Sequence, residues 1–319
     1  MKKGNQIVFL TGGLGNQLFQ LAHGLSNTST NKLDFETRLG NPRGSGHPDL
    51  FDFNLLSDIS GKVHNKNNWF IRKCLSYILH LGVNPNYFEK QKYLRRMIGN
   101  GVGFACSLFF KTWIKVQCFN GVGYSQQEVD IKRKNFLIGY FQTYKWVENL
   151  GTKSILMNIT TKNYSSELEH LREEAKILNP LIVHVRLTDY KSESSFGIPS
   201  QSYYKLAIER LWRSERFKEI WIFTDEPDLV LEYLPKSLPG KFRIIGEIGN
   251  SPAMTLEAMR YGHGYVLANS SFSWWGAYLS YTPDAKVIAP LPWFLNRDEP
   301  LDICPPKWER MNAFQESIE

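Results

Sequence analysis

The 319-residue sequence lacks any uninterrupted apolar run of the roughly 20 residues that a membrane-spanning helix needs. Its most apolar stretch, GVGFACSLFFKTWIKVQCF, is interrupted by Lys111 and Lys115. The N-terminal stretch MKKGNQIVFLTGGLG has an apolar core shorter than the roughly 7 to 15 residues of a secretory signal peptide. These absences disfavour a membrane-spanning or secreted protein and predict a cytoplasmic location.

Metal-binding and disulfide patterns are also missing. The four cysteines, at positions 74, 106, 118 and 304, show neither CxxC nor Cys/His zinc spacing, so we expect free thiols. No Asp-x-Asp occurs, and Asp34-Phe35-Glu36 is the nearest approach to it. A metal that clamps phosphates is therefore not indicated, and we expect neither a metal nor a cofactor.

The net charge of +7 is concentrated in one segment. Between Gly61 and Cys118 ten Lys or Arg face the single acid Glu89, and many aromatic residues are interleaved with them. Such a segment suits the surface of an anionic membrane or a phosphorylated lipid substrate. The alternative is a pair of amphipathic helices whose lysines are simply solvated. Nucleic acid is not expected as a partner, because no binding motif accompanies the charge.

Apolar strands and helical patterns alternate at both ends of the chain. From position 179 onward the strand LIVHVRL, the helix SQSYYKLAIERLWRS and the strand EIWIFTD are followed by a helix over 227–234 and further alternation. Near the N-terminus QIVFL leads through TGGLG into a helix and then to the strand KLDFETR, and residues 50–120 read as mostly helical. This pattern predicts α/β domains over 1–160 and 161–319, with a helical elaboration in the first.

Polar residues follow three predicted strands of the second domain, at the carboxyl ends where doubly wound sheets bind ligands. In chain order these are His184, Arg186 and Asp189; Thr224, Asp225 and Glu226; and Asn269, Ser270, Ser271 and Ser273. In ANSSFSWWG a strand gives way to a helix, so Asn269 or a serine can cap the helix and leave N–H groups for an anion. The guanidinium of Arg186 matches phosphate oxygens. The pattern predicts a nucleotide-diphosphate site, in which Asp225 accepts a hydrogen bond from a guanine amine or a ribose hydroxyl.

Each of these features also has a structural explanation. Arg186 and Asp189 can form a simple salt bridge, TDEPD can cap a helix, and SFSWWG can be core packing. A histidine on a buried strand, such as His184, is more often a satisfied core residue than a catalyst. The case for a site rests on the joint position of these residues at strand ends.

The glycine turn GGLGNQ lacks the third glycine of a dinucleotide fingerprint and the GK[ST] of a P-loop. We expect Gly12, Gly13 and Gly15 to allow close approach of the backbone to a ligand, with Asn16 and Gln17 presenting amides. The alternative is a tight turn from strand to helix with an asparagine cap.

The motifs GGLGNQLFQ, GYFQTYKW, HVRLTDY, IFTDEPD and MTLEAMRYGHGYVLANSSFSWWGAYLS, followed by VIAPLPWF, resemble the ordered motif set of the bacterial α1,2-fucosyltransferases of glycosyltransferase family 11. The resemblance spans essentially the whole chain. Its HxRxxD motif is also similar to that of the α1,6- and protein O-fucosyltransferases. The resemblance implies a GT-B-like fold of two facing Rossmann-like domains. It also implies inverting, metal-independent transfer of L-fucose from GDP-β-L-fucose to the 2-hydroxyl of a galactose-like acceptor.

By position, the resemblance also implies roles for individual residues. Arg186 would hold the β-phosphate, with Asp189 and Asn16 as the other catalytic residues, and His184 would lie near the ribose or phosphates. Asp225 would contact guanine, and Thr224, Asn269 and the loop from Ser270 through Ser271 and Phe272 to Ser273 would complete the donor site. The acceptor cleft would include Gly13, Gly15, Gln17 and Tyr144.

The sequence departs from the family pattern HxRRGD, since Leu187 and Thr188 replace its second arginine and its glycine. A general base is not identifiable; Asp189, Glu193 and His23 are candidates by residue type. Another GDP-sugar as donor, or a non-catalytic glycan-binding protein, are the alternatives. The basic segment 61–118 suggests a lipid-diphosphate-linked acceptor, as in O-antigen assembly, and peripheral contact with the inner face of the plasma membrane.

Overall fold

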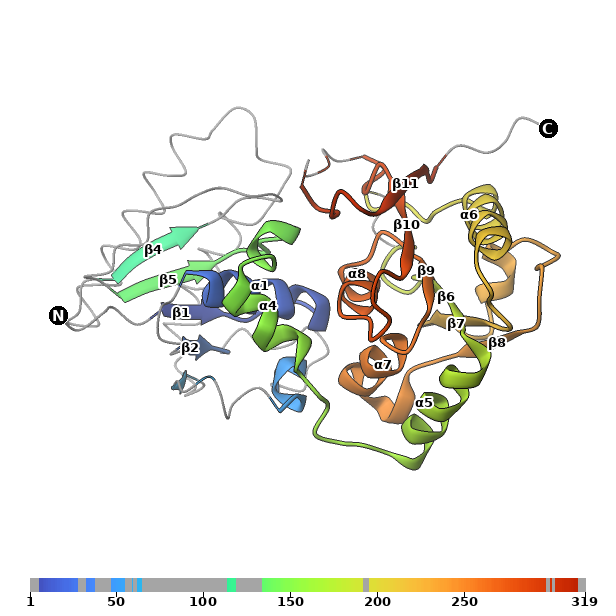
Figure 1. The fold of residues 1–319 in the computed structure, drawn as a ribbon. Helices are drawn as coiled ribbons and strands as arrows, with labels where there is room; N and C mark the ends of the chain where they lie inside the picture. The colour runs from blue at the N-terminus through green and yellow to red at the C-terminus, as the bar shows by residue number, and fades with distance from the viewer. Residues whose placement is uncertain are drawn as a thin grey trace. The chain divides into compact units, whose positions relative to one another are not determined.

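The computed structural model describes residues 6–27, 33–37, 47–54, 59, 62–64, 114–118, 134–191, 195–296, 299 and 302–314. The chain divides into two compact units, residues 1–160 with 300–303 and residues 161–299 with 304–319 (Figure 1). The division falls between 160 and 161, where the sequence placed it, but residues 300–303 belong with the first unit rather than the second. Two contacts explain this, because Tyr144 N donates to Asp302 O at 3.2 Å and Lys145 Nζ lies 3.4 Å from the Asp302 carboxylate.

Within the described residues, the first unit contains a five-stranded parallel sheet. Its order is β3 (Val63–His64), β2 (Leu33–Glu36), β1 (Gln6–Phe9), β5 (Lys134–Ile138) and β4 (Ile114–Cys118). The chain adds β2 and β3 on one side of β1 and then β4 and β5 on the other, with β5 next to β1. The strand order therefore reverses between β1 and β5.

The helix α1 (Leu14–Ser26) packs directly on this sheet. A side chain at Gly24 would come within 2.6 Å of Val8 on β1, so glycine allows the close approach. The 3-10 helices η1 (Asp49–Asp52) and η3 (Tyr144–Trp146) and the helix α4 (Leu150–Met157) complete the described helical part of the unit.

The prediction that residues 50–120 are mostly helical is wrong at 63–64 and 114–118, which are strands. The stretch IKVQC alternates apolar and polar residues with the period of two that a strand requires. The rest of that region, including most of the basic segment 61–118, lies outside the described residues.

In the described part of the second unit, six parallel strands form the sheet. Its order is β11 (Glu309–Asn312), β10 (Lys286–Leu291), β9 (Gly264–Val266), β6 (Leu181–Val185), β7 (Ile220–Thr224) and β8 (Phe242–Ile245). Two doubly wound parallel sheets confirm the predicted α/β class with two Rossmann-like units. The facing arrangement of the units stays a prediction.

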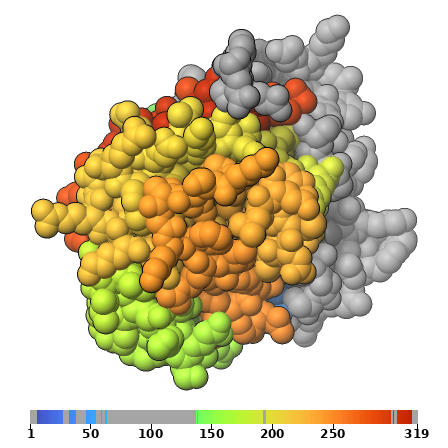
Figure 2. Space-filling model, turned by 90° about the vertical axis from the view of Figure 1, so that its right-hand side faces the viewer, coloured from blue at the N-terminus to red at the C-terminus, as the bar shows by residue number. Residues whose placement is uncertain are grey.

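Helix α5 (Ser166–Leu178) precedes the first strand of this sheet, β6, and the helices α6 (Gln201–Ser214), α7 (Pro252–Met259) and α8 (Ser271–Tyr278) connect later strands. The sequence missed β11, a short edge strand with no strong apolar alternation. It also predicted a helix over 227–234, where the structure has only the 3-10 turn η4 (Val230–Tyr233), and it did not predict the 3-10 turn η5 (Ile248–Asn250). Figure 2 shows a face of this unit on which α5, in light green, and α6, in yellow, lie at the surface.

The side chains of β6 alternate between two environments, as the pleat of a strand dictates. Val183 and Val185 pack in a core with Tyr203 and Tyr204 of α6. The neighbouring residue His184 lies on the opposite face, where its ring centroid is 6.1 Å from that of Phe272 on α8. The sheet thus has α6 on one face and α8 on the other at the level of His184.

A buried ion pair joins α7 to the segment after α8. Arg260 is 0% exposed, and its Nη1 donates to Glu257 at 2.8 Å while its Nε donates to Leu279 O at 2.9 Å. The Tyr281 hydroxyl donates to the other oxygen of Glu257 at 2.6 Å, and the Arg260 guanidinium lies 4.1 Å from the centre of the Tyr281 ring. Both charges therefore have protein partners.

Candidate functional site

The carboxyl edge of the second sheet brings the three predicted polar sets together. Strand β6 lies between β9 and β7, with Val183 opposite Val266 and Val185 opposite Thr224. The chain passes from β6 outward to β7 and β8 and then returns to β9 on the other side of β6. The strand order thus reverses between β6 and β9, which is where doubly wound sheets bind their ligands.

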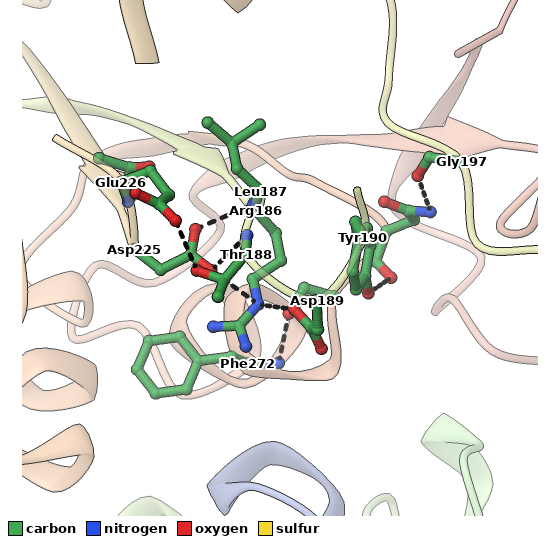
Figure 3. A network of polar contacts seen from close by, with 12 residues as sticks. Arg186, Leu187, Thr188, Asp189, Tyr190, Gly197, Asp225, Glu226 and Phe272 are labelled. Carbon is green, nitrogen blue, oxygen red and sulfur yellow. Dashed lines mark hydrogen bonds and ion pairs between the residues drawn. The ribbon is translucent and has the colours of Figure 1, made fainter. Parts of the chain in front are cut away.

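Arg186, immediately after β6, is held through one nitrogen. Its Nε donates to Asp189 Oδ1 at 2.7 Å and lies 3.2 Å from Asp225 Oδ2. Burial opposes the charge, but the hydrogen bond to Asp189 and the two carboxylates raise the pKa of Arg186 above its usual value. Its terminal nitrogens point away from both carboxylates (Figure 3), and they have no partner within the described residues. The guanidinium is thus oriented, charged and available to an anion.

Asp225, after β7, organises the loop that carries Arg186. Its Oδ1 accepts from Leu187 N at 2.9 Å and its Oδ2 from Thr188 N at 3.1 Å. Burial opposes its charge, but Arg186 and the hydrogen bonds from Thr188 and Leu187 lower its pKa. Both oxygens already have partners, so the geometry supports a positioning role, and contact with guanine stays a prediction. Leu187 and Thr188, which replace the family's arginine and glycine, stabilise this loop by donating backbone N–H groups to Asp225.

Asp189 is 53% exposed and bonded to Arg186 Nε, so it also positions the arginine. The structure thus favours that role over a general base for Asp189. Glu193, the second candidate base, lies outside the described residues.

His184 is buried in this structure and 4% exposed. Burial lowers its pKa to about 4, and its Nδ1 has no hydrogen-bond partner within the described residues. The imidazole is therefore neutral near pH 7 and does not supply positive charge to an anion. Its predicted contact with ribose or phosphate stays a prediction.

Between β9 and α8 the loop is shaped by its own polar side chains. The Ser270 hydroxyl caps α8 by accepting from Phe272 N at 3.3 Å, so the serine rather than Asn269 is the cap. Asn269 Nδ2 donates to Phe196 O and Gly197 O, and Ser273 Oγ donates to Ala268 O and Ser270 O. These bonds hold Asn269 Nδ2 and Ser273 Oγ within the loop, and the predicted contact of this loop with the diphosphate stays a prediction.

Thr224, Ser271 and Phe272 complete the predicted donor set. Thr224 Oγ1 accepts from Glu226 N at 3.1 Å, which forms a turn after β7. Ser271 and Phe272 lie in the first turn of α8, where backbone N–H groups and the helix dipole favour an anion.

Sequence reasoning missed Tyr190. Its hydroxyl donates to Asn269 O at 2.8 Å, and its ring stacks on Phe196 at 4.9 Å, so it joins the loop after β6 to the loop after β9 (Figure 3). Burial raises the pKa of Tyr190, which keeps the hydroxyl protonated as a donor. The tyrosine stands inside HVRLTDY, but only the fold shows what it contacts.

The carboxyl edge of the first sheet carries the glycine turn. Gly12 has φ +75, and a side chain there would come within 2.7 Å of Asn16 Nδ2, so the fold itself requires glycine. Gly13 has an ordinary extended backbone, and a side chain there would meet nothing within 4 Å. Gly15 is buried within α1. Gly12 and Gly15 therefore have structural roles, whereas the outer side of Gly13 is open.

The amides of this edge are used in two ways. Gln17 is 1% exposed, donates to Gly12 O at 2.8 Å and accepts from Leu50 N at 2.9 Å, which corrects the prediction that it presents an amide to sugar. Asn16 is half-buried, and its Oδ1 accepts from Gln142 Nε2 at 2.8 Å. Tyr144 is half-buried at the start of η3. Their sugar contacts stay predictions.

His23, the third candidate base, is excluded from that role. It is 2% exposed, lies 3.8 Å from the ring centre of Phe141 and contacts the edge of Trp146. Burial lowers its pKa to about 3. The side chain is part of the core.

Replacing Gly13 with serine distinguishes an effect on the stability of the fold from an effect on ligand binding. Serine is a better helix cap than glycine, and Gly13 caps α1 without any side-chain hydrogen bond, so we expect thermal stability to be unchanged or raised. If a ligand approaches the open side of Gly13, the added side chain should lower kcat/KM at least about tenfold, which corresponds to about 1.4 kcal/mol. The measurements are the melting temperature and kcat/KM; unchanged kcat/KM would remove Gly13 from the site.

The burial of neutral His184 predicts a pH dependence of stability. Between its folded pKa of about 4 and the ordinary value of 6.5, the unfolded chain binds a proton that the folded chain does not. The free energy of unfolding should therefore fall as the pH drops from 6.5 towards 4. His184→Gln should reduce this slope by up to about 1.4 kcal/mol per pH unit, measured by urea unfolding at several pH values. An identical slope in both proteins would show that His184 titrates normally.

No group of three or more His, Cys, Asp or Glu side chains that could hold a metal ion occurs in the part of the chain that the structure describes. Within the same residues, no helix is long and apolar enough to cross a membrane.

Comparison with known protein families identifies the class of this protein. The family model described as Glycosyl transferase family 11 matches residues 7–308. The chain belongs to this family, and it is a glycosyltransferase.

Two curated relatives and one solved structure show what it is similar to. The alpha-1,2-colitosyltransferase of Escherichia coli is 27% identical over 320 residues, covering 95% of this chain and 97% of the relative. The O-antigen biosynthesis glycosyltransferase WbnK of Escherichia coli is 24% identical over 310 residues, covering 91% and 95%. The fucosyltransferase NodZ from Bradyrhizobium is 12% identical with a TM-score of 0.48, covering 88% of this chain and 93% of NodZ, which is too distant to carry an argument.

Proposed function

We propose that this glycosyltransferase moves L-fucose from GDP-β-L-fucose to the 2-hydroxyl of a galactose-like residue, with inversion at the anomeric carbon. The observation that carries the nucleotide-diphosphate part is Arg186, which two carboxylates orient through Nε and whose terminal nitrogens are turned away from them. The family membership and the motif resemblance support the sugar and the linkage.

The proposed mechanism follows from the charge that develops. The acceptor oxygen forms a bond to C1 while the bond from C1 to the phosphate oxygen breaks, and the acceptor proton leaves to a base. The departing GDP gains negative charge, so a donor aimed at the diphosphate stabilises the transition state more than the ground state. Arg186 is assigned this role, and the N-terminal dipole of α8 favours the anion on the other side of the switch point.

Metal independence belongs to the same proposal. The family resemblance implies it, and Arg186 with the first turn of α8 would offset the charge of the diphosphate in place of a cation. We further propose an acceptor of the O-antigen type, linked to a lipid diphosphate at the inner face of the cytoplasmic membrane. The name of the relative WbnK supports the O-antigen assignment.

A second donor has specific support. The relative that is 27% identical over nearly the full length of both chains is named a colitosyltransferase. Colitose is L-fucose without the 3-hydroxyl, so the same GDP-binding edge would serve both donors. The linkage in that name, α1,2, agrees with the proposed linkage.

The test is release of GDP from GDP-L-fucose and from GDP-colitose in the presence of EDTA, against a panel of β-galactosides. Turnover that depends on the acceptor and prefers GDP-L-fucose by kcat/KM supports the first proposal, and a preference for GDP-colitose supports the second. Turnover abolished by EDTA and restored by Mg²⁺ would refute metal independence. Absence of GDP binding in calorimetry would refute both donors.

A further inference from the structure

An amide pair stands at the carboxyl edge of the first sheet. Asn16 Oδ1 accepts from Gln142 Nε2 at 2.8 Å, although the two residues are 126 positions apart in sequence. They follow β1 and β5, the two strands between which the strand order of this sheet reverses. The pair therefore occupies, in the first unit, the position at which a doubly wound sheet binds ligands.

The loop that carries Gln142 is held in a costly conformation. Phe141 has φ 52, in a left-handed region that bulky residues rarely adopt, at a cost of order 1 to 3 kcal/mol. Its ring is 1% exposed and stacks on His23, while Gln20 Nε2 donates to Gly139 O at 3.0 Å. These contacts fix the backbone on both sides of the turn, and Gln142 lies beside Asn16.

The hydrogen-bond partner of Gln142 is of a different kind from those of Gln17 and Gln20 at the same edge. Gln17 and Gln20 direct their amides at backbone groups, which is what holding a loop requires. Gln142 instead contacts a side chain, and its Oε1 has no partner in the part of the chain that the structure describes. A half-buried amide with an acceptor and a second N–H available matches the hydroxyl of a sugar, which both donates and accepts.

The surroundings leave room for such a ligand on the same loop. The Asn16 amide extends over Gly12, where a Cβ would come within 2.7 Å of its Nδ2, whereas at the neighbouring Gly13 a Cβ would meet nothing within 4 Å. We propose that Gln142 is a sugar-positioning residue, which orients the Asn16 amide and binds a hydroxyl of one of the two sugar substrates through Oε1. This rests on the proposed glycosyl transfer.

The experiment compares Gln142→Ala and Gln142→Glu with wild type. Glutamate has nearly the same shape as glutamine but has no N–H for Asn16 Oδ1 when ionised, so it tests the hydrogen bond without leaving a cavity. The matched control is Asn158→Ala, which removes an exposed amide of the same unit that donates to Ser154 O. For each protein the measurements are the melting temperature, the Kd for GDP by calorimetry, and kcat and KM for donor and acceptor separately.

We expect the Kd for GDP to stay within about twofold in both Gln142 variants and kcat/KM to fall about 10- to 100-fold, the effect of losing one or two hydrogen bonds. A rise confined to the acceptor KM assigns the hydroxyl to the acceptor, and a rise confined to the donor KM, with GDP affinity unchanged, assigns it to the donor sugar. In an Asn16→Ala background, Gln142→Ala should cost much less than in wild type, because the two amides act together.

Three results would contradict this proposal. Normal kcat/KM for both substrates in both Gln142 variants, with Arg186-dependent GDP binding intact, overturns this proposal and leaves the proposed function standing. A loss that tracks the melting temperature, or that Asn158→Ala reproduces, assigns Gln142 a structural role only. If the wild-type protein does not bind GDP, the proposed function fails and this proposal fails with it.

Discussion

Arg186→Ala is expected to lower kcat by roughly two to three orders of magnitude, with a smaller loss in GDP affinity. Removing one preorganised donor aimed at developing charge costs about 3 to 4 kcal/mol of transition-state stabilisation. The side chain satisfies the conditions for this role, because Asp189 and Asp225 hold its Nε at 2.7 and 3.2 Å and leave the terminal nitrogens for the leaving group. The measurement is steady-state kinetics with GDP-sugar and acceptor, together with calorimetric titration of GDP.

Arg186→Lys sharpens this prediction. An ammonium keeps the positive charge, but it cannot contact both carboxylates through one nitrogen and a diphosphate through two others. We expect most of the loss to persist in this variant. The matched control is Arg213→Ala, which removes an arginine that is 78% exposed and paired with Glu209 on α6, and which should leave kcat unchanged. A residual kcat near one half in Arg186→Ala would refute the assignment.

Glu257→Ala is expected to cost about 3 to 5 kcal/mol of stability. The substitution leaves Arg260, which is 0% exposed, as a buried charge without its carboxylate and also leaves the Tyr281 hydroxyl without its acceptor. Breaking a buried ion pair on one side is much more costly than the pair is stabilising, since desolvation of the remaining charge is uncompensated. The measurement is urea unfolding followed by tryptophan fluorescence.

Two further variants isolate the cause. Glu169→Ala on α5 removes a carboxylate of an exposed pair with Arg172, at 3.5 Å, and should change stability by no more than about 1 kcal/mol. Replacing Glu257 and Arg260 together with methionine removes both charges and should recover much of the stability that Glu257→Ala loses. A loss below about 1 kcal/mol in Glu257→Ala would show that Arg260 finds water or another partner.

Much of the fold was predictable because strand and helix periodicities are local properties. The strands at 6–9, 33–36, 181–185, 220–224 and 286–291 follow from short apolar runs bounded by polar turns. The errors at β11 and η4 fall in segments whose own pattern is weak, whereas IKVQC carries a strand pattern that a mostly helical reading of 50–120 overlooked. The edge strand β11 and the short turn η4 depend on the elements beside them.

The site was predictable in location more than in detail. Parallel strands place their carboxyl ends at one edge, so polar residues after β6, β7 and β9 had to converge once the strands were identified. Which of them contact each other depends on side-chain directions and loop conformations. The carboxylate of Asp225 therefore turned out to bind the loop after β6, and Asn269 and Ser273 turned out to bind backbone carbonyls.

The sequence by itself determined the α/β class, the two-unit division near residue 160 and the family, because these depend on periodicity and on motifs whose order along the chain is sufficient. The tertiary structure alone decided which polar side chains form hydrogen bonds within the fold. It buried His23 and Gln17, oriented Arg186 through two carboxylates from different loops, and paired Asn16 with Gln142 across 126 positions. Hydrogen-bond partners distant in sequence are set by how the strands are ordered in the sheets, and that order is a property of the whole folded unit.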